Sequence, residues 1–346
     1  MENNENNVES ELCNEPKLHG YKIVCVKLGL TMCVYFICRL LVALGISKFG
    51  DALGRLGETA SGLISSVLII IFIYIIPMLF AAMIFKSFSN YKGKYRILYK
   101  KPRRLARALG TFPATFGLGH GIALLTLLVS YLILRHFSMP DYIEELFRPT
   151  VMEPTTNMVS VLTMVFMLVV IAPLFEEFLT RGIMYDALKP YGTGMAILIS
   201  SLLFGLMHGS LYMLFYTTAY GLALGYIRYA TDSLFTVTIL HAIINAIAAV
   251  ALLLTSLMEI TGEGNRFVNT TFMIFIVAML VMIIVGIVVF LAKIPAVRKF
   301  KIENSWTDIG GWKKTAWFFA SVPVIIMMVL AVNELAGHWL LSLVIR

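Results

Sequence analysis

Charged residues are scarce in this chain: only 14% of its 346 residues are Asp, Glu, Lys or Arg. Soluble domains carry roughly 25% charged residues, whereas 59% of this chain is hydrophobic and its mean hydropathy is +0.84. A soluble globular protein is therefore excluded. The sequence predicts an integral membrane protein that passes the bilayer several times.

The alternation of apolar and polar residues that is typical of membrane-spanning strands is absent. Long unbroken apolar runs occur instead, and about 20 such residues suffice for one helix to cross a bilayer. The runs lie near residues 28–47, 63–85, 112–134, 158–178, 193–207, 211–227, 233–257, 270–292 and 315–332. We predict an all-α fold, a polytopic membrane bundle of eight or nine transmembrane helices. The segment 337–345 is too short to cross and is expected at the membrane interface.

Cysteine is also rare. Cys13, Cys25, Cys33 and Cys38 show no CxxC spacing, and three of them lie in the first predicted helix. We predict reduced thiols with an apolar role, and neither a disulfide framework nor a metal site. The N-terminal segment lacks a basic stretch and a cleavage site, so no signal peptide is expected to be removed.

The net charge of +8 is unevenly distributed along the chain. Residues 86–110 hold nine Lys or Arg and no acid, and residues 293–314 hold six basic residues. In residues 137–157, by contrast, four of the five charged residues are acidic. Basic loops remain in the cytoplasm, which predicts a cytoplasmic N-terminus. Contact of the basic loops with anionic lipid is favoured over nucleic-acid binding.

We expect three segments along the chain. Residues 1–21 are predicted to be a polar, disordered tail, and 22–292 a transmembrane bundle with a motif region at 156–258. Residues 293–346 are predicted to form a basic cytoplasmic loop and a C-terminal membrane helix. The two halves of the chain do not mirror each other, which weighs against transporters built from inverted repeats. The asparagine-rich tail and compact loops favour the plasma membrane of a bacterium.

Several ionisable residues in apolar runs have structural interpretations. Arg39 is expected to form an interior ion pair or a lipid-headgroup contact, because charges within spans usually avoid the hydrocarbon. His120, between glycines, is expected in a packed contact between helices. Glu334 lies near the end of an apolar run and carries no functional prediction.

Three polar patches remain, and all lie between residues 173 and 245. They are EEFLTR (176–181), FGLMH (204–208) and HAIIN (241–245). Residues four apart share a helix face, so Glu177 can pair with Arg181, Phe204 lies one turn before His208, and His241 and Asn245 project together. At 1.5 Å per residue, each patch lies about 12 to 20 Å from the same membrane side. The patches are therefore expected to share one layer.

These groups suit water-driven cleavage of an amide. A carboxylate and an imidazole can hold a water and remove its proton. Two hydrogen-bond donors at one point, such as His241 and Asn245, suit the oxyanion that forms when water attacks a carbonyl. Such attack within a bilayer is intramembrane proteolysis. Ser210 is a weak candidate nucleophile, because it lacks a G-x-S-x-G setting.

The three motifs together resemble those of the CAAX prenyl protease and bacteriocin-processing family, also called the abortive-infection family. Its patterns EExxxR, FxxxH and HxxxN occur here in order, and the similarity covers about residues 156–258. The resemblance implies a metal-independent intramembrane glutamic endopeptidase with no cofactor. It implies that Glu176 and His208 activate the water and that His241 and Asn245 form the oxyanion site. Glu177, Arg181 and Phe204 would support the site.

Other interpretations stay open. The patches can simply hold helices together, or the chain can be a non-catalytic family member that acts as a scaffold or bacteriocin-immunity protein. A zinc protease would use His208, His241 and a glutamate, but H-E-x-x-H is absent and Asn is a poor zinc ligand. A proton-coupled transporter would use the carboxylates as a relay. The expected partners are the lipid bilayer and a membrane peptide or protein, lipidated or not, and no nucleic acid.

Overall fold

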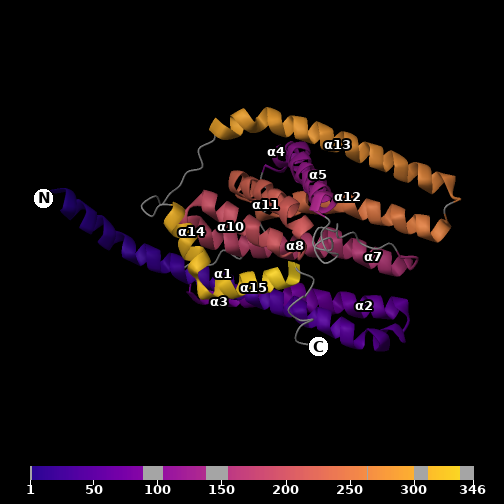
Figure 1. Ribbon diagram of the computed structural model, residues 1–346, viewed down its shortest axis with the longest axis horizontal. Coiled ribbons are helices and arrows are strands. Elements are labelled where there is room, and N and C mark those ends of the chain that lie inside the picture. The colour runs from indigo at the N-terminus through magenta and orange to yellow at the C-terminus, as the bar shows by residue number, and fades with distance from the viewer. Residues whose placement is uncertain (1, 89–103, 138–154, 263, 300–310, 336–346) are drawn as a thin grey trace.

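The computed structural model describes residues 2–88, 104–137, 155–262, 264–299 and 311–335. Within these ranges every regular element is helical, which confirms the all-α prediction. The longer helices run broadly along the long axis of the molecule, with α13 along one edge and α1, α2 and α3 along the other (Figure 1). The helices that carry the three polar patches lie between these edges.

The N-terminal part of the chain forms long helices. The elements are α1 (Glu2–Gly54), α2 (Glu58–Ile69), the π-helical η1 (Ile70–Ile75), α3 (Ile76–Phe88), the short α4 (Leu105–Leu109) and α5 (Phe112–Phe137). The boundary predicted at residue 21 falls inside the continuous helix α1. The division into three segments stays a prediction.

The central part is one long helical segment with changes of winding, followed by a helical pair. Its elements are α7 (Met158–Phe166), η3 (Met167–Ile171), α8 (Ala172–Glu177), η4 (Phe178–Met184), α9 (Tyr185–Leu188), η5 (Lys189–Tyr191), α10 (Thr193–Leu206) and α11 (Leu211–Thr231). The C-terminal elements are α12 (Leu234–Thr261), α13 (Arg266–Lys299), α14 (Gly311–Ala320) and α15 (Val322–Leu335).

Polar side chains begin three of these helices. Asn157 accepts hydrogen bonds from the backbone N–H groups of Val159 and Ser160, both at 3.1 Å, at the start of α7. Ser210 and Ser233 act in the same way before α11 and α12. Such caps satisfy backbone donors that lack a partner within the helix. The Ser210 hydroxyl is thus accounted for as a helix cap.

The number of spans differs from the sequence-based count. Six described helical segments are long and apolar enough to cross a membrane, or seven if the bent pair α14 and α15 is one span. The predicted apolar runs are helical, but α10 has only 14 residues and α11 falls outside the six. The predicted count of eight or nine transmembrane helices is therefore not confirmed. A run of apolar residues in the sequence does not show where one helix ends and the next begins.

Some predictions lie wholly or partly outside the described residues. These are the charge distribution across 89–103, 138–154 and 300–310, and the interfacial segment at 337–345. Of the cysteines, Cys25, Cys33 and Cys38 are free and buried.

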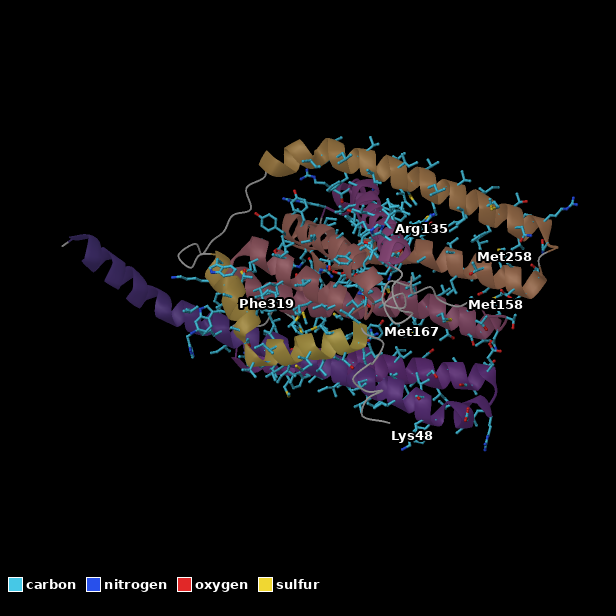
Figure 2. The ribbon with its side chains drawn as sticks, viewed as in Figure 1. Lys48, Arg135, Met158, Met167, Met258 and Phe319 are labelled. Atoms are coloured by element: carbon cyan, nitrogen blue, oxygen red, sulfur yellow. The ribbon has the colours of Figure 1, made fainter. Side chains whose placement is uncertain are left out.

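The largest buried cluster surrounds the central helices on the α1 side. It joins α1 residues such as Leu28 and Met32 to Met184 of η4, Leu203 of α10 and Met327 of α15, all essentially inaccessible. Apolar side chains also cover the outer surface, projecting along α13 and α2 (Figure 2). An apolar core with an apolar exterior is the arrangement expected of an integral membrane protein.

Helices α5 and α13 pack with almost no space between their backbones. A Cβ atom added to Gly117 would lie 2.1 Å from the carbonyl carbon of Gly286. Small residues permit such close approach between membrane helices. His120 of α5 packs against α11, where the Tyr220 hydroxyl lies 2.6 Å from its Nδ1. This confirms the predicted role of His120 in a contact between helices.

Candidate active site

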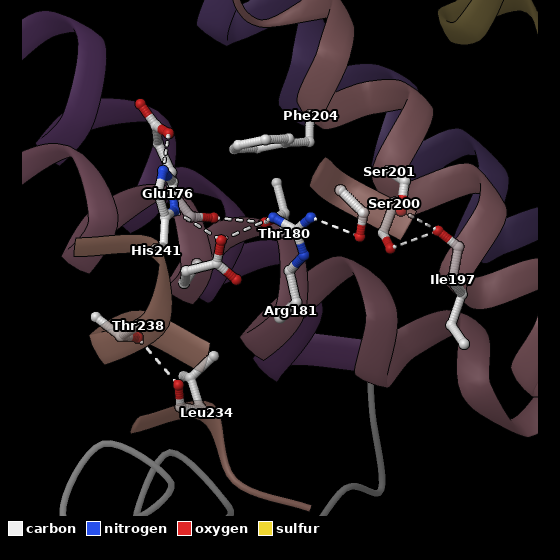
Figure 3. A network of polar contacts seen from close by, with 12 residues as sticks. Glu176, Thr180, Arg181, Ile197, Ser200, Ser201, Phe204, Leu234, Thr238 and His241 are labelled. Atoms are coloured by element: carbon white, nitrogen blue, oxygen red, sulfur yellow. Dashed lines mark hydrogen bonds and ion pairs between the residues drawn. The ribbon is translucent and has the colours of Figure 1, made fainter. Parts of the chain in front are cut away.

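Arg181 lies at the centre of the polar network (Figure 3), and it forms an ion pair with Glu177. Arg181 Nη1 lies 3.0 Å from Glu177 Oε1, and both side chains are fully buried. Arg181 also donates from Nη1 to the Thr180 hydroxyl at 2.8 Å and from Nη2 to the Gly221 carbonyl of α11 at 3.0 Å. The pairing predicted from the spacing of four is confirmed.

His241 of α12 contacts both adjacent carboxylates, and Figure 3 shows it beside Glu176. Its Nδ1 donates to Glu177 Oε1 over 2.9 Å, and its Nε2 lies 3.9 Å from Glu176 Oε2. Glu177 Oε1 therefore accepts from both Arg181 and His241. The ionised carboxylate can only accept, so Nδ1 carries a proton and Nε2 is the ring nitrogen that faces Glu176.

Glu176 lies at the edge of this network and is more accessible than Glu177. Its side chain is 13% exposed, compared with 0% for Glu177. Tyr74 of η1 donates its hydroxyl to Glu176 Oε1 over 3.5 Å. Sequence reasoning missed Tyr74, and its one available signal was a tyrosine within an isoleucine-rich run. The neighbouring carboxylates thus have different surroundings: Glu177 is fully buried with Oε1 bound by Arg181 and His241, and Glu176 retains access.

His208 is positioned by Phe204, one turn earlier on α10. Its Nδ1 donates to the Phe204 carbonyl over 2.8 Å, which fixes the tautomer and leaves a lone pair on Nε2. The Phe204 ring lies 4.9 Å from the His208 ring, 5.6 Å from the His241 ring and 4.4 Å from the Arg181 guanidinium. Phe204 therefore links all three motifs.

Asn245 lies one turn after His241 on α12 and faces the first motif helix. Its Nδ2 donates to the Leu168 carbonyl of η3 over 2.9 Å. Leu168 lies in a π-helical turn, and a second such turn, η4, begins directly after Glu177. Changes of winding of this kind are frequent at functional sites. They leave this helix irregular on both sides of the two glutamates.

The structure brings the sequence-predicted residues together with one gap. Glu177, Arg181, His241 and Glu176 form one connected cluster, and Phe204 adds His208 to it. Among the described residues, no hydrogen bond or ion pair joins His208 directly to Glu176. In the same part of the chain, no group of three or more His, Cys, Asp or Glu is arranged to hold a metal ion.

Two charged residues outside the three motifs also form an ion pair. Arg39 of α1 forms an ion pair with Glu334 of α15, which confirms the first of the two expectations for Arg39. Glu334 carried no functional prediction, because it lies near the end of an apolar run. In the structure its carboxylate is 8% exposed and paired with Arg39.

Comparison with known proteins gives a family-model match over the region that holds this cluster. Residues 158–247 match the family model Rce1-like, described as type II CAAX prenyl endopeptidase Rce1-like. The chain carries an Rce1-like region. This confirms the resemblance seen in the three motifs, and the match contains all of them. Neither the curated proteins nor the solved structures that were compared gave a match.

The Rce1-like region supports a peptidase function, since the family is one of proteases. The apolar helices indicate an integral membrane protein. An Rce1-like segment within such helices is consistent with substrates in or at the bilayer.

Proposed function

We propose that the protein is an intramembrane endopeptidase that hydrolyses peptide bonds of membrane-associated or lipidated peptides. The observation that carries the proposal is the meeting of Glu176, Glu177, Arg181 and His241 within the Rce1-like region. A buried cluster of this kind is costly unless each charge is balanced. One of its carboxylates is nevertheless free of a charged partner closer than 3.9 Å.

In this mechanism, Glu176 and His208 activate the attacking water. Glu176 is the accessible carboxylate, and Tyr74 holds one of its oxygens. His208 contributes the lone pair on Nε2, because its Nδ1 proton is committed to the Phe204 carbonyl. A water that donates to both groups would lose a proton as it attacks the carbonyl carbon. General-base assistance of this type contributes about 10²- to 10⁴-fold to a rate.

His241 and Asn245 supply the oxyanion site in the same mechanism. Nδ1 of His241 already donates its hydrogen bond to Glu177. Nε2 is therefore the nitrogen that would face the substrate oxygen. Donation from Nε2 requires the imidazolium form, whose charge Glu176 and Glu177 would balance. Asn245 would offer the second amide N–H, since the other is bound to Leu168. Glu177 and Arg181 act by holding His241 in place.

We also propose the finer placement of the protein. The basic loops favour a cytoplasmic N-terminus, and the composition of the tail favours a bacterial plasma membrane. The substrate would reach the site from the bilayer.

The first prediction concerns metal. Because Glu176 and His208 are proposed to hold the water directly, cleavage should continue after prolonged treatment with a strong chelator. The measurement uses purified protein in lipid nanodiscs and a panel of synthetic membrane peptides, farnesylated and unlipidated, with products identified by mass spectrometry. A known zinc-dependent protease serves as the control for chelation.

Two results would contradict this proposal. Activity that disappears with a stoichiometric metal and returns on its addition would exclude the glutamic mechanism. Failure to cleave any peptide, with uptake of protons or solutes by sealed vesicles, would instead support a transporter.

The second prediction concerns Asn245. Replacement of Asn245 by Ala removes one proposed oxyanion donor, and loss of such a donor costs about 10²- to 10³-fold in kcat. KM should change little, because the interaction strengthens only in the transition state. The measurement is kcat and KM on the best-cleaved peptide. A rise in KM at unchanged kcat would show that Asn245 binds substrate instead. A fall in thermal stability alone would show that Asn245 has only a structural role, through its hydrogen bond to the Leu168 carbonyl.

A further inference from the structure

The carbonyl of Met207, next to His208, is held by side chains from outside the Rce1-like region. Helix α10 ends at Leu206, and the chain starts α11 only at Leu211. The last carbonyls of a helix lack partners within it. Here Tyr35 donates its hydroxyl to the Met207 carbonyl over 2.9 Å, and Arg39 donates from Nη1 to the same oxygen over 2.7 Å.

Arg39 is itself fixed from two sides. It forms the ion pair with Glu334 through Nε and donates from Nη1 to the Tyr35 hydroxyl over 3.3 Å. Its charge also suits the position, because a helix C-terminus carries partial negative charge and favours cations. The last turn of α10 contains no basic residue of its own. Arg39 supplies that charge from α1.

The same ion pair packs on the residue that follows His208. Gly209 has a φ of +66°, a left-handed conformation in which glycine is favoured. A Cβ atom at Gly209 would lie 2.7 Å from Glu334 Oε1 and 2.8 Å from Arg39 Nη2. The backbone on both sides of His208 is therefore in contact with this group.

The helices that carry the group are closely packed against each other. A Cβ atom on Gly29 of α1 would lie 2.6 Å from the backbone of Pro323 and Val324, at the start of α15. Cys33 donates its thiol to the Pro323 carbonyl over 3.3 Å. Tyr35, Arg39 and Glu334 thus lie on two closely packed helices, and their contacts with Met207 and Gly209 are at the end of α10.

We propose that Tyr35, Arg39 and Glu334 form a clamp that positions His208 for catalysis. The catalytic effect of the clamp rests on the proposed function. Its effect on the position of the His208 ring does not. By fixing the Met207 carbonyl and the Gly209 backbone, it sets where the His208 imidazole stands relative to Glu176. The three residues are positioning residues and touch no substrate.

The test uses two clamp variants and two matched controls. Tyr35→Phe removes one donor to the Met207 carbonyl. The double variant Arg39→Met/Glu334→Leu removes the other without leaving a lone buried charge, which by itself would destabilise the protein. Tyr185→Phe is the control for the first, since its buried hydroxyl has no hydrogen-bond partner among the described residues. Arg228→Met/Asp186→Leu is the control for the second, because it likewise removes an ion pair between two helices, of 3.1 Å, outside the three motifs. Arg228 also pairs with Asp232, which is 61% exposed and therefore remains solvated in this variant.

We expect kcat to fall at least about tenfold in the double clamp variant, because small misplacements of catalytic groups greatly reduce the rate. The fall should be smaller in Tyr35→Phe. In both variants KM should stay within about threefold of the unmodified protein. The controls should retain the kcat of the unmodified protein. A second readout is 15N NMR of histidine-labelled protein in nanodiscs, with His208 assigned by its loss in His208→Gln. The clamp variants should shift the His208 ring signals away from the single Nδ1–H tautomer, and the controls should not.

The two readouts separate failure of the clamp from failure of the proposed function. A clamp variant that folds and retains both kcat and the His208 signals overturns the clamp. So does an equal loss of kcat in the matched control. If the unmodified protein cleaves no peptide while the clamp variants still shift His208, the clamp stands and the peptidase mechanism is wrong.

Discussion

Glu176→Gln is expected to abolish cleavage in a protein that still folds and binds peptide. The substitution retains the size of the side chain and one acceptor oxygen but removes the base, whose loss costs about 10²- to 10⁴-fold in rate. Tyr74 can still donate to the amide oxygen, so the surroundings of residue 176 should persist. The measurement is single-turnover cleavage together with binding of a fluorescent peptide.

Glu259→Gln is a suitable control for this experiment. It makes the same change on an exposed glutamate at the end of α12, and it should leave the rate unaltered. If Glu176→Gln retains most of its activity, the accessible carboxylate is not the base and our assignment of roles fails.

Glu177→Gln is expected to act mainly on stability. Glu177 is 0% exposed, and its Oε1 accepts from both Arg181 and His241. Neutralising it leaves the Arg181 charge buried without its counter-charge, and breaking a buried pair in this way costs about 3–5 kcal/mol. The thermal unfolding temperature in detergent should fall clearly, while activity at low temperature should fall only in part.

The double variant Glu177→Gln/Arg181→Met tests the cause of that loss. Because it removes both charges, it should recover much of the stability. A Glu177→Gln protein that is as stable as the unmodified one but inactive would reverse the roles of the two glutamates. The comparison with Glu176→Gln under the same conditions makes that outcome unambiguous.

The sequence predicted contacts that lie within one helix. The Glu177–Arg181 pair follows from a spacing of four, and the hydrogen bond from His208 to the Phe204 carbonyl has the same spacing. The apolar runs were likewise sufficient to predict the helices themselves. Local periodicity is enough for such features, because one turn of helix fixes which residues are neighbours.

The expected depths of the three patches predicted that they share one layer, but the individual atoms that meet between distant segments were not predicted. Nothing in the spacing indicates that His241 turns Nδ1 to Glu177, or that Tyr74 reaches Glu176. The end of α10 likewise lies beside a contact that the sequence does not indicate, because Tyr35 and Arg39 of α1 donate to the Met207 carbonyl. The role of Glu334 was invisible for the same reason: its partner is separated from it by most of the chain.

The pairing of Arg39 with Glu334 has a consequence for biosynthesis. A ribosome makes α1 first, so the guanidinium enters the membrane long before its carboxylate partner exists. During that interval α1 carries an unpaired charge, which raises the free energy of placing the nascent helix in the hydrocarbon core of the membrane. The charge is paired with Glu334 once α15 has been made. The geometry that we propose for His208 would thus be complete only after α15 joins α1.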